Sequence, residues 1–138
     1  MIIKKKSPIH KLGMFAEKNI PKGTKIIEYL GEIISKEEEA RREKQNEKTN
    51  ATYIFNYNSR FSIDGAIGGN ESRLINHSCD PNCDATRSKN HVFYVSNRAI
   101  LKDEELTVDY SFDADDPPEI CHCGSHKCRG FINEVRHP

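Results

Sequence analysis

Short apolar runs separated by polar turns predict a chain built mainly from strands. Residues 19–34, "NIPKGTKIIEYLGEII", are apolar and β-branched after a Pro-Lys-Gly turn, and Gly31 interrupts the run. This pattern predicts a strand or a pair of strands. Residues 51–65, "ATYIFNYNSRFSIDG", alternate and predict a hairpin that turns near residues 58–60. Residues 91–100 and 106–112 each predict one further strand.

One segment, residues 35–48 ("SKEEEARREKQNEK"), has the features of a helix. Ser35 is placed to be its N-cap, with Glu38 at the N3 position of a capping box. Glu37 and Glu38 each precede an arginine by four residues, which is the favourable order for ion pairs on a helix. We therefore expect one short, solvated helix in a mostly β fold. The acidic, Pro-rich segment that begins at Asp113 predicts a linker to a cysteine-rich tail.

Composition and charge narrow the class of protein. The 138 residues suit one domain, and a hydrophobic share of 36% predicts a modest core that a metal would help to stabilise. Lysine plus arginine and aspartate plus glutamate both total 21, so the net charge of zero argues against direct nucleic-acid binding. No apolar run approaches the roughly 20 residues of a membrane helix. The N-terminus lacks the apolar core of a signal peptide, so we expect an intracellular protein, cytoplasmic or nuclear, with reduced thiols.

The cysteines indicate a metal site. Cys121, Cys123 and Cys128 lie close together in the polar tail. Structural zinc takes four ligands, so three thiolates leave one position to fill. The spacing does not choose among the candidates, which are His122, His126, Cys79 and Cys83. A closed site of this kind would pin the tail to the rest of the chain, and its binding energy would add to folding.

The segment "NHSCDPNC" (76–83) is also compatible with a different chemistry. His77 and Cys79 lie two residues apart, so on an extended chain their side chains point the same way and could form a nucleophile pair. Use of Cys79 as a zinc ligand would exclude this pair, because its sulfur would then be bound to the metal.

Six motifs, in order, resemble those of SET-domain protein lysine methyltransferases with a post-SET zinc loop. The resemblance covers the chain from Lys5 to Asn133 and is closest to the trithorax-like branch and the short stand-alone bacterial members. The motifs are "SPIHKLGMFA" (7–16), "EYLGEII" (28–34), "YIF" (53–55), "GGNESRLINHSCDPNC" (68–83), "EELTVDYSF" (104–112) and "CHCGSHKCRGFIN" (121–133).

The resemblance implies a SET fold of several small, curved sheets with a knot-like threading of the chain near "NHSC". It implies a SET domain over residues 1–113, followed by an acidic linker and a post-SET tail over residues 114–138. It also implies that Cys79 joins Cys121, Cys123 and Cys128 around one structural Zn²⁺. Cys83 is then left as a free, structural thiol.

The implied activity is transfer of methyl groups from S-adenosylmethionine to a lysine side chain of a protein, such as a histone-like tail. Tyr110 resembles the catalytic tyrosine of the family, and Tyr53 resembles a tyrosine near both cofactor and lysine. Tyr57 and Phe112 are candidates for the substrate channel, as is Val108. The cofactor-binding residues implied by the resemblance are His10, Leu12, Gly13, Tyr53, Asn76, His77 and His122.

Two departures from the family pattern matter. The first loop has Lys11-Leu12-Gly13 where Gly-x-Gly is usual, so a positive φ at Lys11 would strain the backbone. Val108 stands where Phe or Tyr is usual, which predicts a roomy pocket that allows di- or trimethylation. Lys11 also keeps open an alternative, in which an inactive SET module binds a lysine-bearing peptide. We expect the protein to bind a protein substrate and no membrane. We expect it to be a monomer or a weak dimer.

Overall fold

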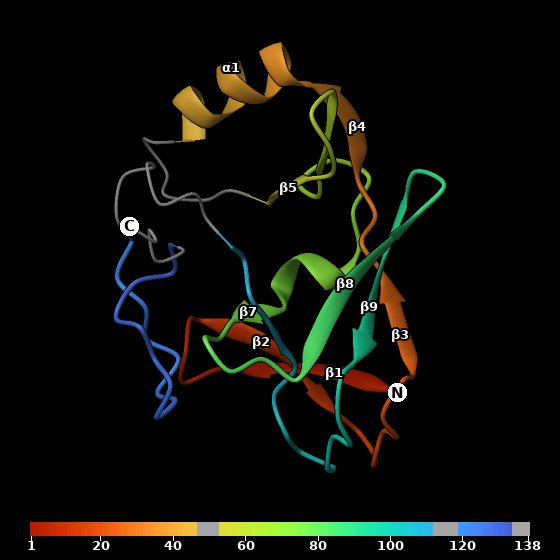
Figure 1. Cartoon of the computed structure of the whole chain (residues 1–138), viewed down its shortest axis with the longest axis vertical. Helices are drawn as coiled ribbons and strands as arrows, with labels where there is room; N and C mark the ends of the chain where they lie inside the picture. Colours follow the sequence, from red (N-terminus) through yellow and green to blue (C-terminus); the bar gives the residue numbers. More distant parts are fainter. Residues whose placement is uncertain (47–52, 112–118, 134–138) are drawn as a thin grey trace, which may run out of the picture. The chain divides into compact units, whose positions relative to one another are not determined.

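The computed structural model describes residues 1–46, 53–111 and 119–133, and it is mostly β with one α-helix among these residues (Figure 1). This confirms the predicted fold class. The elements are β1 (Ile2–Lys6), β2 (Leu12–Ala16), β3 (Lys25–Glu28), β4 (Glu32–Ser35), α1 (Lys36–Asn46), β5 (Ile54–Asn56), β6 (Phe61–Asp64), the 3₁₀ helix η1 (Glu71–Leu74), β7 (Asn76–His77), β8 (Cys83–Ser88), β9 (His91–Ser96) and β10 (Thr107–Val108).

The strands form four small sheets within the described residues. β1 pairs with β2, and the two three-stranded sheets have the orders β3-β9-β8 and β4-β6-β5. The fourth sheet joins β7 and β10, which run parallel although they lie far apart in the sequence. Its register places Thr107 opposite Asn76 and Val108 opposite His77. The short β7–β10 sheet therefore brings "NHSC" and the "TVDY" segment together.

The described residues divide into two compact units. The first comprises Met1–Ile26, Leu74–Ala85 and the described residues from Tyr94 onward, and the second comprises the described residues of Ile27–Arg73 with Thr86–Phe93. The core of the first unit consists of residues that are almost fully buried: Met14, Ala16, Ile20, Ile75, Ile100 and Leu106. In the second unit the buried apolar residues are Tyr29, Ile34, Ile63 and Val92. The predicted domain boundary at residue 113 stays a prediction, because residues 112–118 lie outside the described ranges.

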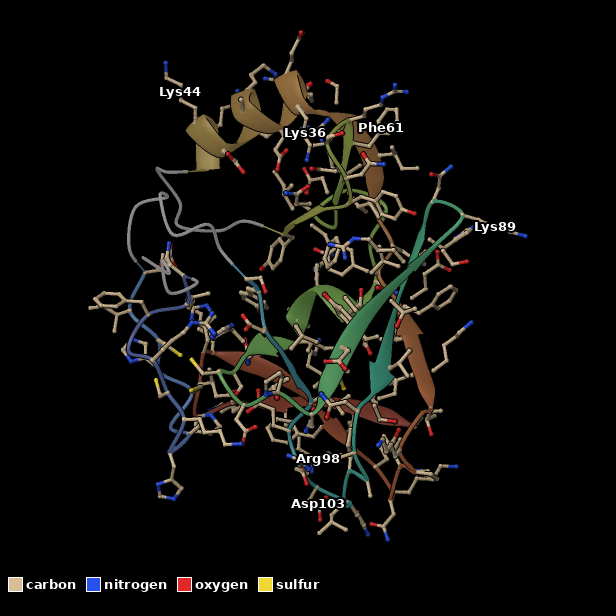
Figure 2. The ribbon with its side chains drawn as sticks, in the orientation of Figure 1. Lys36, Lys44, Phe61, Lys89, Arg98 and Asp103 are labelled. Carbon is tan, nitrogen blue, oxygen red and sulfur yellow. The ribbon has the colours of Figure 1, made fainter. Side chains whose placement is uncertain are left out.

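The helix forms where its capping signals predicted. The backbone N–H of Glu38 donates to Ser35 Oγ at 3.2 Å, which makes Ser35 the N-cap of α1. Lys36 points from the first turn toward β5 and β6, whereas Lys44 points away from the sheet (Figure 2). Lys36 Nζ donates to Asn56 Oδ1 at 2.7 Å and to Ser62 Oγ at 2.8 Å. These contacts fix the start of the helix on the β4-β6-β5 sheet.

Charged pairs along α1 follow the predicted order in part. Arg42 lies 3.6 Å from Glu38, four residues earlier, as predicted, but Arg41 binds Glu38 and not the predicted Glu37 among the described contacts. Arg42 also pairs with Asp64 on β6 at 2.9 Å. The described helix is 11 residues long and highly charged, and no helix in the described ranges is long and apolar enough to cross a membrane.

The predicted strands form, with differences in extent. β5 and β6 make the predicted hairpin, and the Asn58 side chain accepts the N–H groups of Arg60 and Phe61 at its turn. Residues 51–52 of that prediction lie outside the described ranges. Gly31 separates β3 from β4, which pair with different strands. A Cβ on Gly31 would come within 2.3 Å of the Asp64 carbonyl, so glycine is required there.

The last predicted strand is shorter than residues 106–112, and four of the described strands were not predicted. β10 ends at Val108, because the N–H of Tyr110 donates to the His77 ring and Ser111 has a φ of 52°. The strands missed by the sequence pattern are β1, β2, β7 and β8. Because β1 ends in three consecutive lysines, it shows no alternation of apolar and polar residues that would indicate its pairing with β2. β8 is largely exposed beyond Cys83.

Candidate active site and metal centre

Four cysteines of the first unit form a sulfur cluster. The Sγ atoms of Cys79, Cys121, Cys123 and Cys128 all lie within 4.8 Å of one another. Cys79 follows β7, and the other three lie on the loop between Ile120 and Phe131, which pair as an isolated bridge. Gly124, with a φ of 73°, turns this loop back on itself. The fold thus brings one cysteine of "NHSC" to the three of the tail.

The geometry of the cluster fits a tetrahedral zinc ion. Zinc–sulfur bonds of about 2.3 Å imply sulfur–sulfur edges of about 3.8 Å in a tetrahedron. The Sγ atoms of Cys79 and Cys121 lie 3.8 Å apart. Backbone N–H groups of Cys123, Arg129 and Gly130 donate to three of the four sulfur atoms at 3.4 Å. Such donors stabilise thiolates, so these four residues could hold a metal.

The thiols of the cluster differ in acidity. Burial raises the pKa of Cys79 and raises that of Cys121 to about 12. Burial also acts to raise the pKa of Cys123, but hydrogen bonds to its sulfur from backbone N–H groups and neighbouring thiols outweigh it and lower the pKa to about 6. Cys123 is therefore the thiol in the cluster that ionises most readily among these three.

Cys83 lies outside the cluster. It is 1% exposed, and burial raises the pKa of its thiol to about 12. Its Sγ donates to Asn82 Oδ1 at 3.4 Å. A buried, protonated thiol of this kind is chemically inert.

His77 lies between the sulfur cluster and Tyr110. Its Nε2 is 3.5 Å from Cys79 Sγ, and its Nδ1 accepts the Tyr110 N–H at 3.0 Å. The side chain is 3% exposed, and burial lowers the pKa of the ring to about 4 against the opposing charge of Asp109. The neutral ring therefore carries its proton on Nε2, where it faces Cys79. The nucleophile-pair alternative for His77 and Cys79 loses support, because Cys79 lies within the four-sulfur cluster.

Tyr110 is held at both its backbone and its hydroxyl. Its backbone N–H donates to His77 Nδ1, and its hydroxyl donates to the Ile75 carbonyl at 2.6 Å. Its ring lies at a tilt against the His77 ring, with centroids 5.4 Å apart, and the residue is 37% exposed. Val108, two residues earlier on β10, is buried. The end of β10 thus presents a fixed, partly exposed tyrosine beside a buried valine.

The buried side chain of Asn76 organises the first loop. Its Nδ2 is 2.9 Å from the Leu12 carbonyl, 3.4 Å from the His10 carbonyl and 2.9 Å from Glu105 Oε2. Ser7 Oγ lies 2.8 Å from both carboxylate oxygens of Glu105. The structure therefore brings together three residues of the predicted cofactor set and adds Ser7 and Glu105, which the sequence reasoning missed.

Gly13 packs closely against the side chains of Glu105 and Asn76, which a larger residue would displace. A Cβ there would come within 2.3 Å of Glu105 Oε2 and 3.0 Å of Asn76 Nδ2. Lys11, two residues earlier, has a φ of 28°, in the region that favours glycine. The backbone at Lys11 is strained, as the departure from Gly-x-Gly predicted. His122 is exposed within the cysteine loop, and Phe112 lies outside the described residues.

Tyr53 and Tyr57 belong to the second unit. The Tyr53 carbonyl accepts the Tyr29 hydroxyl and the Gly65 N–H, and the Arg73 guanidinium lies 5.4 Å from the Tyr53 ring centre. The Tyr57 hydroxyl accepts the Asn90 N–H at 3.0 Å. Tyr57 also lines an apolar groove of about 140 Å³ with Ile33, Phe61, Ile63 and Asn90.

Comparison with known proteins identifies the family. The sequence model of the SET domain matches residues 11–111. The chain is 44% identical over 135 residues to histone-lysine N-methyltransferase 2D of Homo sapiens, covering 93% of this chain and 2% of that protein. It is 40% identical over 133 residues to the H3 lysine-4 specific histone-lysine N-methyltransferase of Schizosaccharomyces pombe, covering 92% and 14%. It is 37% identical over 134 residues to histone-lysine N-methyltransferase trithorax of Drosophila virilis, covering 93% and 4%.

This chain therefore belongs to the SET domain family. It spans only 2% to 14% of the length of these relatives, so the similarity concerns one part of much longer proteins.

Proposed function

We propose that this protein is a protein-lysine N-methyltransferase that uses S-adenosylmethionine. The observation that carries the proposal is the fixed position of Tyr110 at the end of β10, in a chain whose residues 11–111 match the SET domain. A tyrosine held at its backbone and its hydroxyl can orient a small reacting group, and positioning is the main requirement of an in-line methyl transfer.

Tyr110 is the proposed catalytic residue. Because its hydroxyl donates its proton to the Ile75 carbonyl, the phenol oxygen acts toward other groups as an acceptor. An acceptor at this point suits a lysine amine and a polarised methyl group, which it would contact through N–H···O and weak C–H···O interactions. An exposed lysine has a pKa of about 10.4 and is charged at neutral pH. A dry channel lowers that pKa, which favours the neutral amine that accepts the methyl group.

The proposed cofactor site is the loop tied together by Asn76. Carbonyl oxygens of His10 and Leu12 and the carboxylate of Glu105 surround its amide, so the loop is rich in acceptors. Acceptors of this kind fit a cationic ligand, and S-adenosylmethionine carries an ammonium and a sulfonium group. When bound, it supplies the activated methyl group. The other proposed cofactor residues, by resemblance of their motifs, are Gly13, Tyr53, His77 and His122.

The proposed channel residues are Val108, Tyr57 and Phe112, and for Tyr57 and Phe112 the proposal rests on the resemblance of their motifs. Val108 is the residue proposed to leave room for a second and third methyl group. It is smaller than Phe or Tyr and carries no hydroxyl, so it offers the amine less obstruction and no bound water.

The sulfur cluster is the proposed site of one structural Zn²⁺ per chain, with Cys79, Cys121, Cys123 and Cys128 as ligands. The sulfur–sulfur spacing and the backbone donors support this assignment. A closed site of four thiolates has no open position for substrate, so its role would be structural.

A histone-like tail is the proposed substrate. The relative from Schizosaccharomyces pombe is named as specific for lysine 4 of histone H3, and the other two relatives are named as histone-lysine N-methyltransferases. We therefore propose an H3 tail with lysine 4 as the test substrate. The proposed site of action is inside the cell, where histone-like proteins and reduced thiols are found.

The alternative function is an inactive module that binds a lysine-bearing peptide. The strained backbone at Lys11 favours it, because this loop is the proposed cofactor site. Calorimetric titration of the zinc-loaded protein separates the two functions. The methyltransferase proposal predicts saturable binding of S-adenosylmethionine. Peptide binding without any cofactor binding would instead establish the inactive module.

A second experiment tests the proposed catalytic residue. Tyr110→Phe removes the hydroxyl that bonds to Ile75 while keeping the ring against His77. We expect the rate of methyl transfer to fall about 100-fold or more, with little change in cofactor affinity. Full activity in this variant would disprove the assigned role of Tyr110.

A further inference from the structure

Arg129 joins the cysteine-rich tail to the residue that precedes Tyr110. Its two Nη groups donate to the two carboxylate oxygens of Asp109, each at 3.0 Å. Its Nε donates to the Asn133 carbonyl at 2.8 Å, and its backbone N–H donates to Cys79 Sγ at 3.4 Å. The arginine side chain is 18% exposed. One residue thus contacts a cluster cysteine, Asn133 in the tail and the residue that follows β10.

Asp109 in turn holds the backbone of the residue after Tyr110 and lies close to the ring that binds the Tyr110 N–H. Its Oδ1 accepts the N–H of Ser111 at 2.8 Å, which holds the turn in which Ser111 has a φ of 52°. The same oxygen lies 3.5 Å from His77 Nδ1, the atom that accepts the Tyr110 N–H. Movement of the Asp109 carboxylate would therefore change the position of the Tyr110 backbone.

We propose that Arg129 is a positioning residue for Tyr110. Its planar guanidinium holds Asp109 through two parallel bonds, so that docking of the tail and orientation of Tyr110 form one coupled state. A lysine in its place would keep the charge and lose the two-bond geometry. The consequence for catalysis rests on the proposed function, whereas the coupling itself does not.

The test measures the Tyr110 backbone amide in the zinc-loaded chain of 138 residues. The chain has five tyrosines, so labelling them with ¹⁵N gives five backbone signals, and Tyr110→Phe identifies the one of interest. The variants are Arg129→Lys and the isosteric Asp109→Asn, which spare the fold, together with the double variant. Lys127→Ala is the matched control, because it removes an exposed charge from the same loop.

We expect Arg129→Lys and Asp109→Asn each to speed hydrogen exchange of the Tyr110 amide about tenfold or more, while the Tyr29 amide, bonded to the Val92 carbonyl, keeps its rate. Exchange of the Tyr110 amide should be no faster in the double variant than in either single variant, because both substitutions break the same ion pair. Zinc content should stay at one ion per chain. In methyl transfer, kcat should fall about tenfold with KM for the cofactor nearly unchanged.

Unchanged exchange at Tyr110 in both single variants, with zinc still bound, would overturn the inference, and so would an equal effect of Lys127→Ala. Faster exchange without loss of methyl transfer would confirm the coupling and refute its proposed effect on catalysis. Exchange is measured without substrate or cofactor, so it decides the coupling even if the chain transfers no methyl group.

Discussion

Lys11 occupies a backbone conformation that suits glycine. Its φ of 28° lies in the left-handed region, where the Cβ of an L-residue is crowded by its own backbone. Its carbonyl accepts the Ser7 N–H at 3.0 Å, so the loop is held in this conformation by a bond across it. The strain is therefore built into the proposed cofactor loop.

Lys11→Gly should relieve this strain. The gain exceeds the entropy that glycine adds to the unfolded chain, so we expect the free energy of unfolding to rise by about 0.5 kcal/mol. Chemical denaturation measures it. Lys18→Gly is the control, since Lys18 is exposed and is not among the residues with positive φ. It should lower the stability by about 0.5–1 kcal/mol. Equal losses at the two positions would contradict the assignment of strain.

At the scale of elements, few backbone hydrogen bonds join the described residues 119–133 of the tail, beside the sulfur cluster and the Arg129–Asp109 ion pair. Ile120 and Phe131 form a single bridge, and the Cys121 N–H donates to the Gly130 carbonyl at 2.9 Å. So little pairing cannot order a segment of this length by itself. The metal proposed for the cluster is therefore expected to supply most of the order of the tail.

Removal of the metal with a chelator should expose four reactive thiols and leave Cys83 unreactive. Cys83 is 1% exposed, whereas the four cluster cysteines are partly exposed, so Cys83 should react only after unfolding. A thiol-specific chromophore counts the groups. Cys83→Ser should keep the count at four, and Cys79→Ser should fail to retain zinc. Five reactive thiols in the folded, metal-free protein would contradict this account.

The sequence predicts helix starts and turns correctly where the signal lies in neighbouring residues. The N-cap at Ser35 and the turn at Asn58 depend on neighbouring residues, and both form as predicted. The cysteine spacing and the family motifs together indicated the four residues of the sulfur cluster. By contrast, the Ser7–Glu105 contact joins residues 98 positions apart, and no periodic pattern signals it.

The pairing of Arg129 with Asp109 was also beyond the reach of the sequence. The two residues lie 20 positions apart. Asp109 stands next to Tyr110 and Arg129 next to Cys128, and the motif in each case points to the neighbour. The parallel pairing of β7 with β10 involves two residues on each strand, which is too short for a pattern of alternation. These contacts depend on the folded path of the chain, and they surround the proposed site.

For the molecule as a whole, the size of the proposed lysine channel should set the number of methyl groups added. Val108 is buried on β10, two residues before Tyr110. We expect the wild-type protein to add two or three methyl groups and Val108→Tyr to stop at one, because the larger ring fills the space. Mass spectrometry of the product reads the methylation state, and thermal unfolding checks the fold of the variant. A strict monomethyl product from both proteins would contradict the assignment of Val108.

The most direct test is methyl transfer itself. The zinc-loaded protein is incubated with S-adenosylmethionine and an H3 tail peptide, with a peptide carrying arginine at position 4 as the matched control. Mass spectrometry should detect added methyl groups on lysine 4 of the first peptide and none on the second, and Tyr110→Phe should abolish the signal. Cofactor binding without methylation of this peptide or of any protein in a histone preparation would contradict the assignment as a lysine methyltransferase.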